Sequence, residues 1–259
     1  MNRYENPGLW NWNDKKYQRE LDRIKEILSL LPDDVETILD TGCGNGIFVN
    51  NLDKVKYKRI VGLDISKTAL EHLKTEKMLG NIADLPFPGK SFDLVCSFEV
   101  LEHLPADIYE KAILEIQRVS RKYIMISVPN EENLLAAFIK CPYCFSMFHA
   151  NFHLRTFSKD TLETLFPEFT AITIKQIGHW VKNKNNIFCH LKKVLRLLND
   201  DYKFPVDSLQ CPVCGMLVNK YQKAKRKHLS LIFEIIEKGL RFSKKQRWLF
   251  ALYIRRDIK

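Results

Sequence analysis

The sequence lacks any apolar run that approaches the ~20 residues needed to cross a membrane, although its apolar content is ordinary for a globular protein. Its first residues, Met-Asn-Arg-Tyr-Glu-Asn-Pro, contain no apolar segment of the signal-peptide type. Repeats and low-complexity stretches are absent too. We therefore expect a cytoplasmic protein, either one large domain or one domain that carries a sizeable insertion.

Acidic residues are scarce in the second half of the chain. Residues 1–130 carry a net charge of −2, whereas residues 131–259 carry +12, which is more than the whole excess of +10. A basic half of this kind indicates an anionic partner, such as RNA, a phosphorylated carrier or a membrane surface, or else only a solvated basic face. The basic amphipathic stretch at 220–241 is suited either to peripheral contact with a membrane or to packing against the domain.

Disulfides are not expected, because the seven cysteines occur without a secretory signal. Four of them form two Cys-Pro-x-Cys pairs, Cys141/Cys144 and Cys211/Cys214. Each pair resembles a zinc knuckle, and two knuckles supply the four corners of a closed structural site. Two alternatives remain open: a mixed set in which His149 and His153 join Cys141 and Cys144, or reduced cysteines without metal.

Glycine is sparse, with 10 residues in 259, yet three glycines alternate in Asp40-Thr41-Gly42-Cys43-Gly44-Asn45-Gly46. The apolar run before them predicts a buried strand, a tight turn and the start of a helix. Glycine lets the backbone pass close to a ligand, and a helix start presents free N–H groups to it. The dinucleotide fingerprint needs a glycine where Ile47 stands. Asp40 would repel a pyrophosphate, so the turn favours a cationic or amine-bearing ligand.

Carboxylates also follow the next two predicted strands. Asp64 ends the run Arg59-Ile60-Val61-Gly62-Leu63, about 20 residues past the glycines, where an acid accepts both hydroxyls of a ribose. Asp84 follows a short strand near Met78 and can accept from an exocyclic amine. The three acids Asp40, Asp64 and Asp84 thus outline a nucleoside site.

The remaining pattern alternates strands with helices. Strands are predicted at 91–98, 123–128, 170–174 and 248–254, and helices at 14–31, 67–73, 108–119, 158–165 and 229–240. Trp10 and Trp12 stand before the first helix and are expected to cap the edge of the core, with closure over a cofactor as the alternative.

Residues 37–130 resemble the "type 11" group of class I S-adenosylmethionine-dependent methyltransferases. The resemblance rests on Asp-x-Gly-Cys-Gly-x-Gly, on Leu-Pro-Phe-Pro-x-x-Ser-Phe-Asp-x-Val and on Val-Leu-Glu-His, in this order. It implies an α/β fold with a doubly wound, mostly parallel, seven-stranded sheet of Rossmann-like type, whose last strand is antiparallel, and a Cys-rich insertion on the carboxyl edge. It also implies S-adenosylmethionine as cofactor, held by Asp40, Gly42, Cys43, Gly44, Gly46, Asp64, Ile65, Asp84 and Glu99.

The resemblance divides the chain as follows. Residues 1–35 would form an N-terminal helical lid, and 36–178 the cofactor-binding core with a Cys-Pro-Tyr-Cys loop at 131–157. Residues 179–247 would be a basic insertion with the second knuckle and an amphipathic helix, and 248–259 would be the last strand.

Glu99, Glu102 and His103 lie at i, i+3 and i+4, which on a helix places them on one face. Such a face suits a hard divalent ion such as Mg²⁺. It is similar to metal-dependent O-methyltransferases of quinone precursors and of RNA 3′-terminal ribose, in which a later histidine, matched here by His149 or His153, completes the shell. The alternative assigns Glu99 to the cofactor and makes His103, with Glu102, the catalytic pair without metal.

The expected function is methyl transfer to the hydroxyl of a small molecule, a saccharide or a lipid-linked acceptor. RNA methylation is the main alternative, and a cofactor-binding regulatory module without catalysis is a second one. The fourth strand is not followed by Asn-Pro-Pro-Tyr, which argues against amino methylation. The sequence leaves the acceptor and the oligomeric state open.

Overall fold

The structure is a computed structural model, and it describes residues 3–12, 14–183, 189, 191, 194, 209–216 and 243–257. The chain forms two compact units. Unit 1 comprises residues 1–130, 157–180 and 246–259, and unit 2 comprises residues 131–156 and 181–245. We describe each unit by itself. The predicted amphipathic helix at 229–240 and the basic stretch at 220–241 lie outside the described residues.

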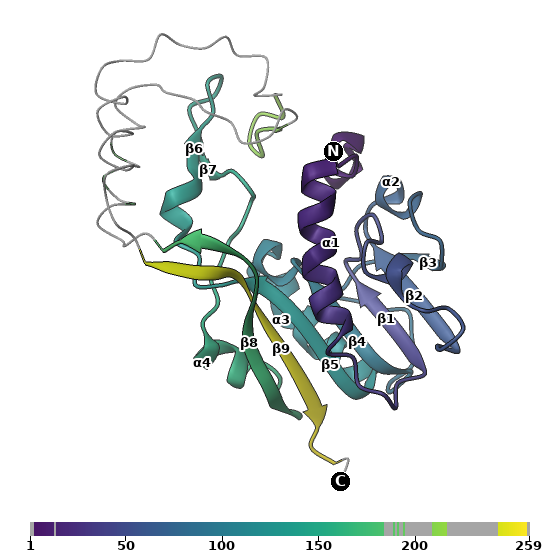
Figure 1. Cartoon of the computed structure of the whole chain (residues 1–259). Helices are drawn as coiled ribbons and strands as arrows, with labels where there is room; N and C mark the ends of the chain where they lie inside the picture. Colours follow the sequence, from purple (N-terminus) through teal and green to yellow (C-terminus); the bar gives the residue numbers. More distant parts are fainter. Residues whose placement is uncertain are drawn as a thin grey trace. The chain divides into compact units, whose positions relative to one another are not determined.

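A seven-stranded sheet organises unit 1 (Figure 1), in the order β3-β2-β1-β4-β5-β9-β8. Strands β1 to β5 pair in parallel, and β9 is antiparallel to β5. The predicted mostly parallel sheet and its antiparallel last strand are therefore confirmed. The strands are β1 Thr37–Thr41, β2 Arg59–Asp64, β3 Glu76–Leu79, β4 Phe92–Phe98, β5 Ser120–Pro129, β8 Phe169–Lys182 and β9 Lys244–Arg255.

Helices flank these strands, and several are shorter than the sequence predicts. The α-helices are α1 Asp14–Leu28, α2 Lys67–Leu70, α3 Ala106–Val119 and α4 Lys159–Glu163. The 3-10 helices are η1 Arg3–Glu5, η2 Pro7–Leu9, η3 Val49–Asn51, η4 Leu101–His103 and η5 Leu134–Ala137. The Ser158 cap is confirmed, because its side chain accepts from the N–H of Thr161.

The prediction of a helix directly after the glycine turn is wrong. Only η3 forms there, and it begins three residues beyond Gly46. The reason is local: Phe48 precedes η3 without a side chain that caps it, and Asn50 and Asn51 bond to backbone oxygens instead of favouring a longer helix.

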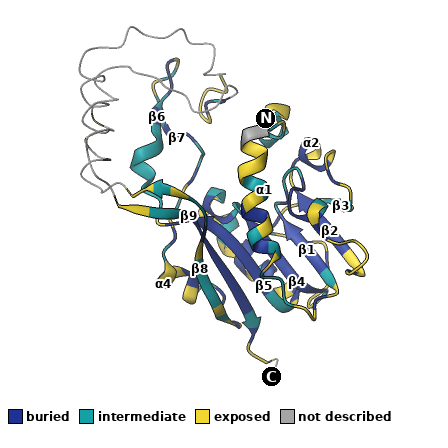
Figure 2. Ribbon diagram, in the orientation of Figure 1, coloured by how far each residue is buried: buried dark blue, intermediate teal, exposed yellow. Residues whose placement is uncertain are grey.

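Apolar residues alternate along the central strands and build one core on each face of the sheet. Leu39, Val95 and Ile124 face the core that contains α3, whereas Ile38, Leu94 and Met125 face the core that contains α1. Side chains in a strand point alternately to opposite faces, so β1, β4 and β5 must be apolar at nearly every position to pack on both sides. Figure 2 shows these central strands buried along their length.

Unit 2 contains an antiparallel hairpin that the sequence did not predict, β6 Phe138–Lys140 with β7 Met147–His149. Its turn holds the first Cys-Pro-x-Cys pair. A small apolar core joins the hairpin to the segment around the second pair: Ile139, Cys141, Phe148, Ala150, Leu209 and Cys211. Over the described residues of both units, no helix has the length and apolarity of a transmembrane span.

Candidate functional site

The three glycines of the turn adopt the left-handed backbone region that other residues avoid. Gly42, Gly44 and Gly46 have φ of +72°, +54° and +75°. A Cβ on Gly42 would lie 2.5 Å from the Val100 side chain, and one on Gly44 would lie 2.9 Å from the Trp10 ring. The turn therefore requires glycine both for its conformation and for its space.

Asp64 ties the glycine turn to the end of β2. Its Oδ2 accepts from the Gly44 N–H at 2.8 Å, and its Oδ1 accepts from the Ser66 N–H at 2.9 Å. Burial raises the pKa of this carboxyl above its ordinary value, and the two backbone donors oppose that rise. The carboxylate retains lone pairs for further donors, such as two ribose hydroxyls.

Asp40 is buried at the carboxyl end of β1, only 2% exposed. Among the described residues its Oδ1 has no hydrogen-bond partner. Burial raises its pKa to about 8, the charge of Asp64 adds to that rise, and Arg23 opposes it. An orphaned carboxylate oxygen is costly to bury, so this side chain is suited to a ligand that brings a positive charge.

The other predicted cofactor residues lie around this turn with different exposure. Cys43 is buried, and burial raises the pKa of its thiol. Ile65, directly after β2, is 50% exposed and therefore available to an apolar ring. Asp84 is exposed in the turn after β3, where its N–H donates to Asn81 O at 3.0 Å.

The N-terminal segment touches the same turn, and the two tryptophans predicted to cap the edge of the core lie in different places. The Trp10 ring covers Gly44, and the Asn45 side chain donates to Trp10 O at 3.4 Å. Glu5 accepts from the N–H groups of Lys67 and Thr68, at 2.9 and 3.1 Å. Trp12 packs on the core that contains α1, as expected of a core-edge residue. The prediction treated both tryptophans alike, because their positions in the sequence do not distinguish them.

Glu99 follows β4 in a strained conformation, with φ +58° in a non-glycine residue. Its Oε2 accepts from the Trp248 indole N–H at 2.6 Å, and its Oε1 lies 3.9 Å from Arg23 Nη1. Burial raises its pKa to about 7, against the opposing charge of Arg23. Arg23 also donates to Ser127 Oγ at 2.7 Å. Its guanidinium therefore links Glu99, directly after β4, to Ser127 in β5.

Glu99, Glu102 and His103 do not share a helix face, contrary to the expectation. Glu99 lies before η4, which contains only Leu101–His103, and its carboxylate turns toward Trp248 and Arg23. The left-handed residue at Glu99 breaks the helical spacing on which the prediction depended. Glu102 is fully buried and His103 is half-buried. Their catalytic role stays a prediction.

Four cysteines of unit 2 come together from two segments far apart in the sequence. The Cys141 and Cys214 sulfurs lie 3.7 Å apart, and so do the Cys144 and Cys211 sulfurs. All four sulfurs lie within 4.8 Å of one another. Ser146 contacts the Cys144 sulfur at 3.0 Å, and its hydrogen bonds lower the pKa of that thiol to about 6.

The histidines of unit 2 gather around Glu132 instead of joining the cysteines. His149 Nε2 lies 3.7 Å from the Glu132 carboxylate, which His153 Nδ1 also contacts. His149 Nδ1 accepts from the N–H groups of Asn151 and His153, at 3.3 and 3.1 Å. A neutral imidazole that accepts at Nδ1 carries its proton on Nε2, so His149 is not poised to ligate a metal through Nε2. Burial also lowers its pKa to about 4.

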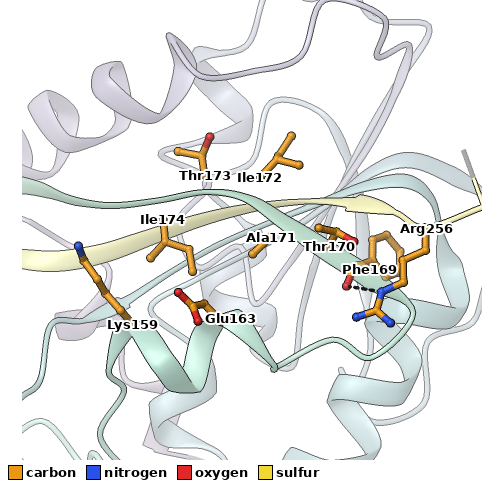
Figure 3. Close-up of a pocket in the computed structure, with 9 residues that line it drawn as sticks. All are labelled: Lys159, Glu163, Phe169, Thr170, Ala171, Ile172, Thr173, Ile174 and Arg256. Carbon is orange, nitrogen blue, oxygen red and sulfur yellow. Dashed lines mark hydrogen bonds between the residues drawn. The ribbon is translucent and has the colours of Figure 1, made fainter. Parts of the chain in front are cut away.

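A groove of about 390 Å³ lies elsewhere on unit 1 (Figure 3). It runs along the edge strand β8 beside α4, and Arg256 at its end donates to Phe169 O at 3.3 Å. None of the predicted site residues lines it. Three strands, β4, β5 and β9, separate β8 from β1 in the sheet. This groove is therefore distinct from the glycine-turn site.

Comparison with known proteins matches residues 39–123 to the model of a methyltransferase domain. A probable S-adenosylmethionine-dependent methyltransferase of Mycobacterium tuberculosis is 33% identical over 102 residues, 36% of this chain and 35% of that protein. The mitochondrial ubiquinone biosynthesis O-methyltransferase of Candida albicans is 31% identical over 121 residues, 42% of this chain and 34% of that protein. The chain spans about half the length of the curated relatives it matches, or less.

Among solved structures, an S-adenosylmethionine-dependent methyltransferase from Archaeoglobus fulgidus superposes with a TM-score of 0.56. It covers 92% of this chain and 94% of its own, at 16% identity, which supports the fold alone. Within unit 1, residues 39–123 therefore match a methyltransferase domain, and the seven-stranded sheet has the Rossmann-like fold of methyltransferases.

The residues of this methyltransferase domain fit the cofactor. The glycine cradle has no room for a Cβ, and Asp40 holds a buried carboxylate oxygen without a hydrogen-bond partner in the described part of the chain. A sulfonium and an ammonium would supply the missing positive charge, and Asp64 would accept from the ribose. The specific residues that hold the cofactor stay predictions.

Replacing Gly44 by Ala should weaken binding of S-adenosylhomocysteine by about tenfold or more, since a side chain there combines left-handed strain with a clash against Trp10. Gly89→Ala is the matched control, because a Cβ there meets its nearest neighbour at 3.4 Å. Isothermal titration calorimetry measures both. Unchanged affinity in the Gly44 variant would contradict the assignment of this turn to the cofactor.

Binding of S-adenosylmethionine at pH 7 should release about one proton, because the free Asp40 carboxyl, with a pKa of about 8, must ionise beside the bound cation. Calorimetry in two buffers of different ionisation enthalpy measures this number. Asp40→Asn should release none and should bind more weakly.

The same pKa shift makes a prediction about stability. Asp40 titrates near 3.8 in the unfolded chain and near 8 in the free fold. Between these values the folded state binds more protons, so the free protein should lose stability as pH rises through this window. Thermal unfolding across that range should show a smaller loss in Asp40→Asn, and an equal loss would argue that the carboxyl is already ionised.

Proposed function

We propose that the chain transfers the methyl group of S-adenosylmethionine to a hydroxyl of a small molecule, a saccharide or a lipid-linked acceptor. The observation that carries the proposal is the buried Asp40 oxygen, which has no hydrogen-bond partner among the described residues and lies beside a turn of three left-handed glycines. The ubiquinone O-methyltransferase of Candida albicans supports a hydroxyl acceptor by similarity. The acceptor oxygen forms the new C–O bond while the C–S bond breaks, and the hydroxyl proton passes to a base on the protein.

His103 is our choice for that base. It ends η4, directly beyond β4, with its backbone N–H bonded to Val100 O at 2.9 Å. In a parallel sheet ligands bind beyond the carboxyl ends of the strands, so η4 borders the region where the acceptor must enter. Because the sulfonium already makes the methyl group electrophilic, the protein has mainly to align the acceptor and remove its proton. Glu102 would orient the imidazole.

Two groups of residues are candidate metal sites, and they would have different roles. Mg²⁺ at Glu99, Glu102 and His103 remains a hypothesis, which the turn of Glu99 toward Arg23 and Trp248 disfavours. Zinc at Cys141, Cys144, Cys211 and Cys214 would take no part in the reaction, because four thiolates leave no coordination position open to an acceptor.

The N-terminal residues 1–35 would act as a lid over the cofactor. Trp10 already lies on Gly44, and Glu5 bonds to the start of α2, next to Asp64. These contacts anchor the segment to the two loops that would hold the adenosyl group. An aromatic cover of this kind keeps water from the sulfonium.

The acceptor should be tested by following S-adenosylhomocysteine release with phenols, saccharides and polyprenol-linked hydroxyls as candidates. His103→Gln should lower kcat/KM by about 10²-fold or more, as loss of a general base does, while the affinity for S-adenosylhomocysteine stays unchanged. Cofactor binding without turnover on any acceptor would favour the regulatory alternative.

The charge of +12 over residues 131–259 favours an anionic acceptor or surface. Filter binding to RNA and flotation with anionic liposomes, each at two salt concentrations, should separate an RNA methyltransferase from a peripheral membrane enzyme. Binding that falls with salt in only one assay identifies the partner. Absence of binding in both would leave the basic residues as a solvated face and favour a soluble small acceptor.

A further inference from the structure

Unit 2 builds the same backbone turn twice, once around each Cys-Pro-x-Cys pair. In the first turn the Cys141 N–H donates to Ser146 O at 2.8 Å, and the Phe145 N–H donates to Cys141 O at 3.0 Å. In the second turn the Cys211 N–H donates to Met216 O at 3.0 Å, and the Gly215 N–H donates to Cys211 O at 3.0 Å. Two separate segments therefore reach the same hydrogen-bonded geometry.

The residue after each second cysteine is left-handed. Gly215 has φ +72°, which glycine adopts freely, whereas Phe145 has φ +60°, which strains a non-glycine backbone. The Phe145 side chain is 63% exposed, so burial of its ring does not account for the strained backbone. Strain of this kind persists where the surroundings fix the turn, and what this turn fixes is the position of the cysteine sulfurs.

Polar groups of the first turn contact sulfurs of both turns. The Tyr143 N–H donates to Cys141 Sγ at 3.4 Å. The Ser146 hydroxyl lies 3.0 Å from Cys144 Sγ and 3.5 Å from Cys211 Sγ, which come from different segments. Neutral thiols are weak acceptors, whereas thiolates bound to a cation carry the charge that such donors stabilise.

The sulfur positions also match the dimensions of a metal tetrahedron. With Zn–S bonds of about 2.3 Å, a regular tetrahedron places its sulfurs about 3.8 Å apart. Two of the four cross-segment sulfur distances are 3.7 Å, and no pair among the four sulfurs exceeds 4.8 Å. A disulfide would require about 2.0 Å, so these thiols are unbonded and surround a central point.

From these observations we infer that Cys141, Cys144, Cys211 and Cys214 bind one Zn²⁺ as four thiolates in a closed structural site. The ion joins the β6–β7 hairpin to the segment at 209–216, beside the small apolar core that includes Ile139, Phe148 and Leu209. Binding releases the protons of those thiols that are still protonated. The mixed set with histidines is not favoured, because His149 and His153 face Glu132.

The test is the metal content of the full-length protein, purified under reducing conditions without added metal, by inductively coupled plasma mass spectrometry. We expect about one zinc per chain. The double variant Cys144→Ser/Cys211→Ser should lose it, whereas Cys189→Ala, which changes a buried thiol outside the cluster, should keep it. Iron in place of zinc would overturn the assignment of the metal, and a metal-free protein with freely reactive thiols would overturn the site.

A second measurement uses the unmodified protein, so its result does not depend on whether a cysteine variant folds. Chelation of the unmodified protein followed by titration with Co²⁺ should produce the visible absorption of a tetrahedral four-thiolate site, with one equivalent at saturation. A spectrum with nitrogen ligands would overturn the all-thiolate set in favour of the mixed one. The predicted cofactor site lies in unit 1, so S-adenosylhomocysteine affinity can be measured separately on the same samples. The outcome for the zinc site is therefore independent of the outcome for methyl transfer.

Discussion

The turn after β1 is the constraint on which the cofactor site depends. Its three left-handed glycines reverse the chain at the edge of the sheet, while the N–H groups of Gly42 and Cys43 both donate to Leu63 O, at 2.7 and 3.0 Å. The neighbouring Gly44 N–H donates to Asp64. This short loop is thus hydrogen-bonded to the end of β2. As a result, Asp64 lies beside the three glycines that follow β1. A side chain at Gly42, Gly44 or Gly46 would disturb both the loop and this placement of Asp64.

Buried charge completes that arrangement. Burial raises the pKa of both Asp40 and Asp64, and the charge of Asp64 raises the pKa of Asp40 further. Arg23 from α1 supplies part of the opposing charge, but it is shared with Glu20, Glu99 and the Ser127 hydroxyl. The carboxylates at the cradle therefore remain under-compensated. A cationic ligand relieves this imbalance, which links the fold of the domain to the chemistry of a sulfonium cofactor.

Unit 2 differs from unit 1 in the size and the composition of its core. Its described core is small, and cysteine sulfurs form part of it. Small cores of this type gain little free energy from apolar burial alone, and metal ligation commonly supplies the remainder. The repeated knuckle turns place four sulfurs within 4.8 Å of one another, while the histidines contact Glu132. The cysteines and the histidines of this unit thus form two separate clusters, each with its own contacts.

The sequence by itself determined the strands of the seven-stranded sheet, the glycine cradle and the acids at the ends of β1 and β2. Those features follow from local rules: apolar runs mark buried strands, and only glycine accepts the turn. The meeting of Trp10 with Gly44 and the strained Glu99 that leaves the face of η4 were decided by tertiary structure. Tertiary structure also decided between the alternatives for the two predicted knuckles, because it brings Cys144 and Cys211 together across the 66 residues between them. Each depends on which distant segment packs beside it, and spacing along the chain does not encode that contact.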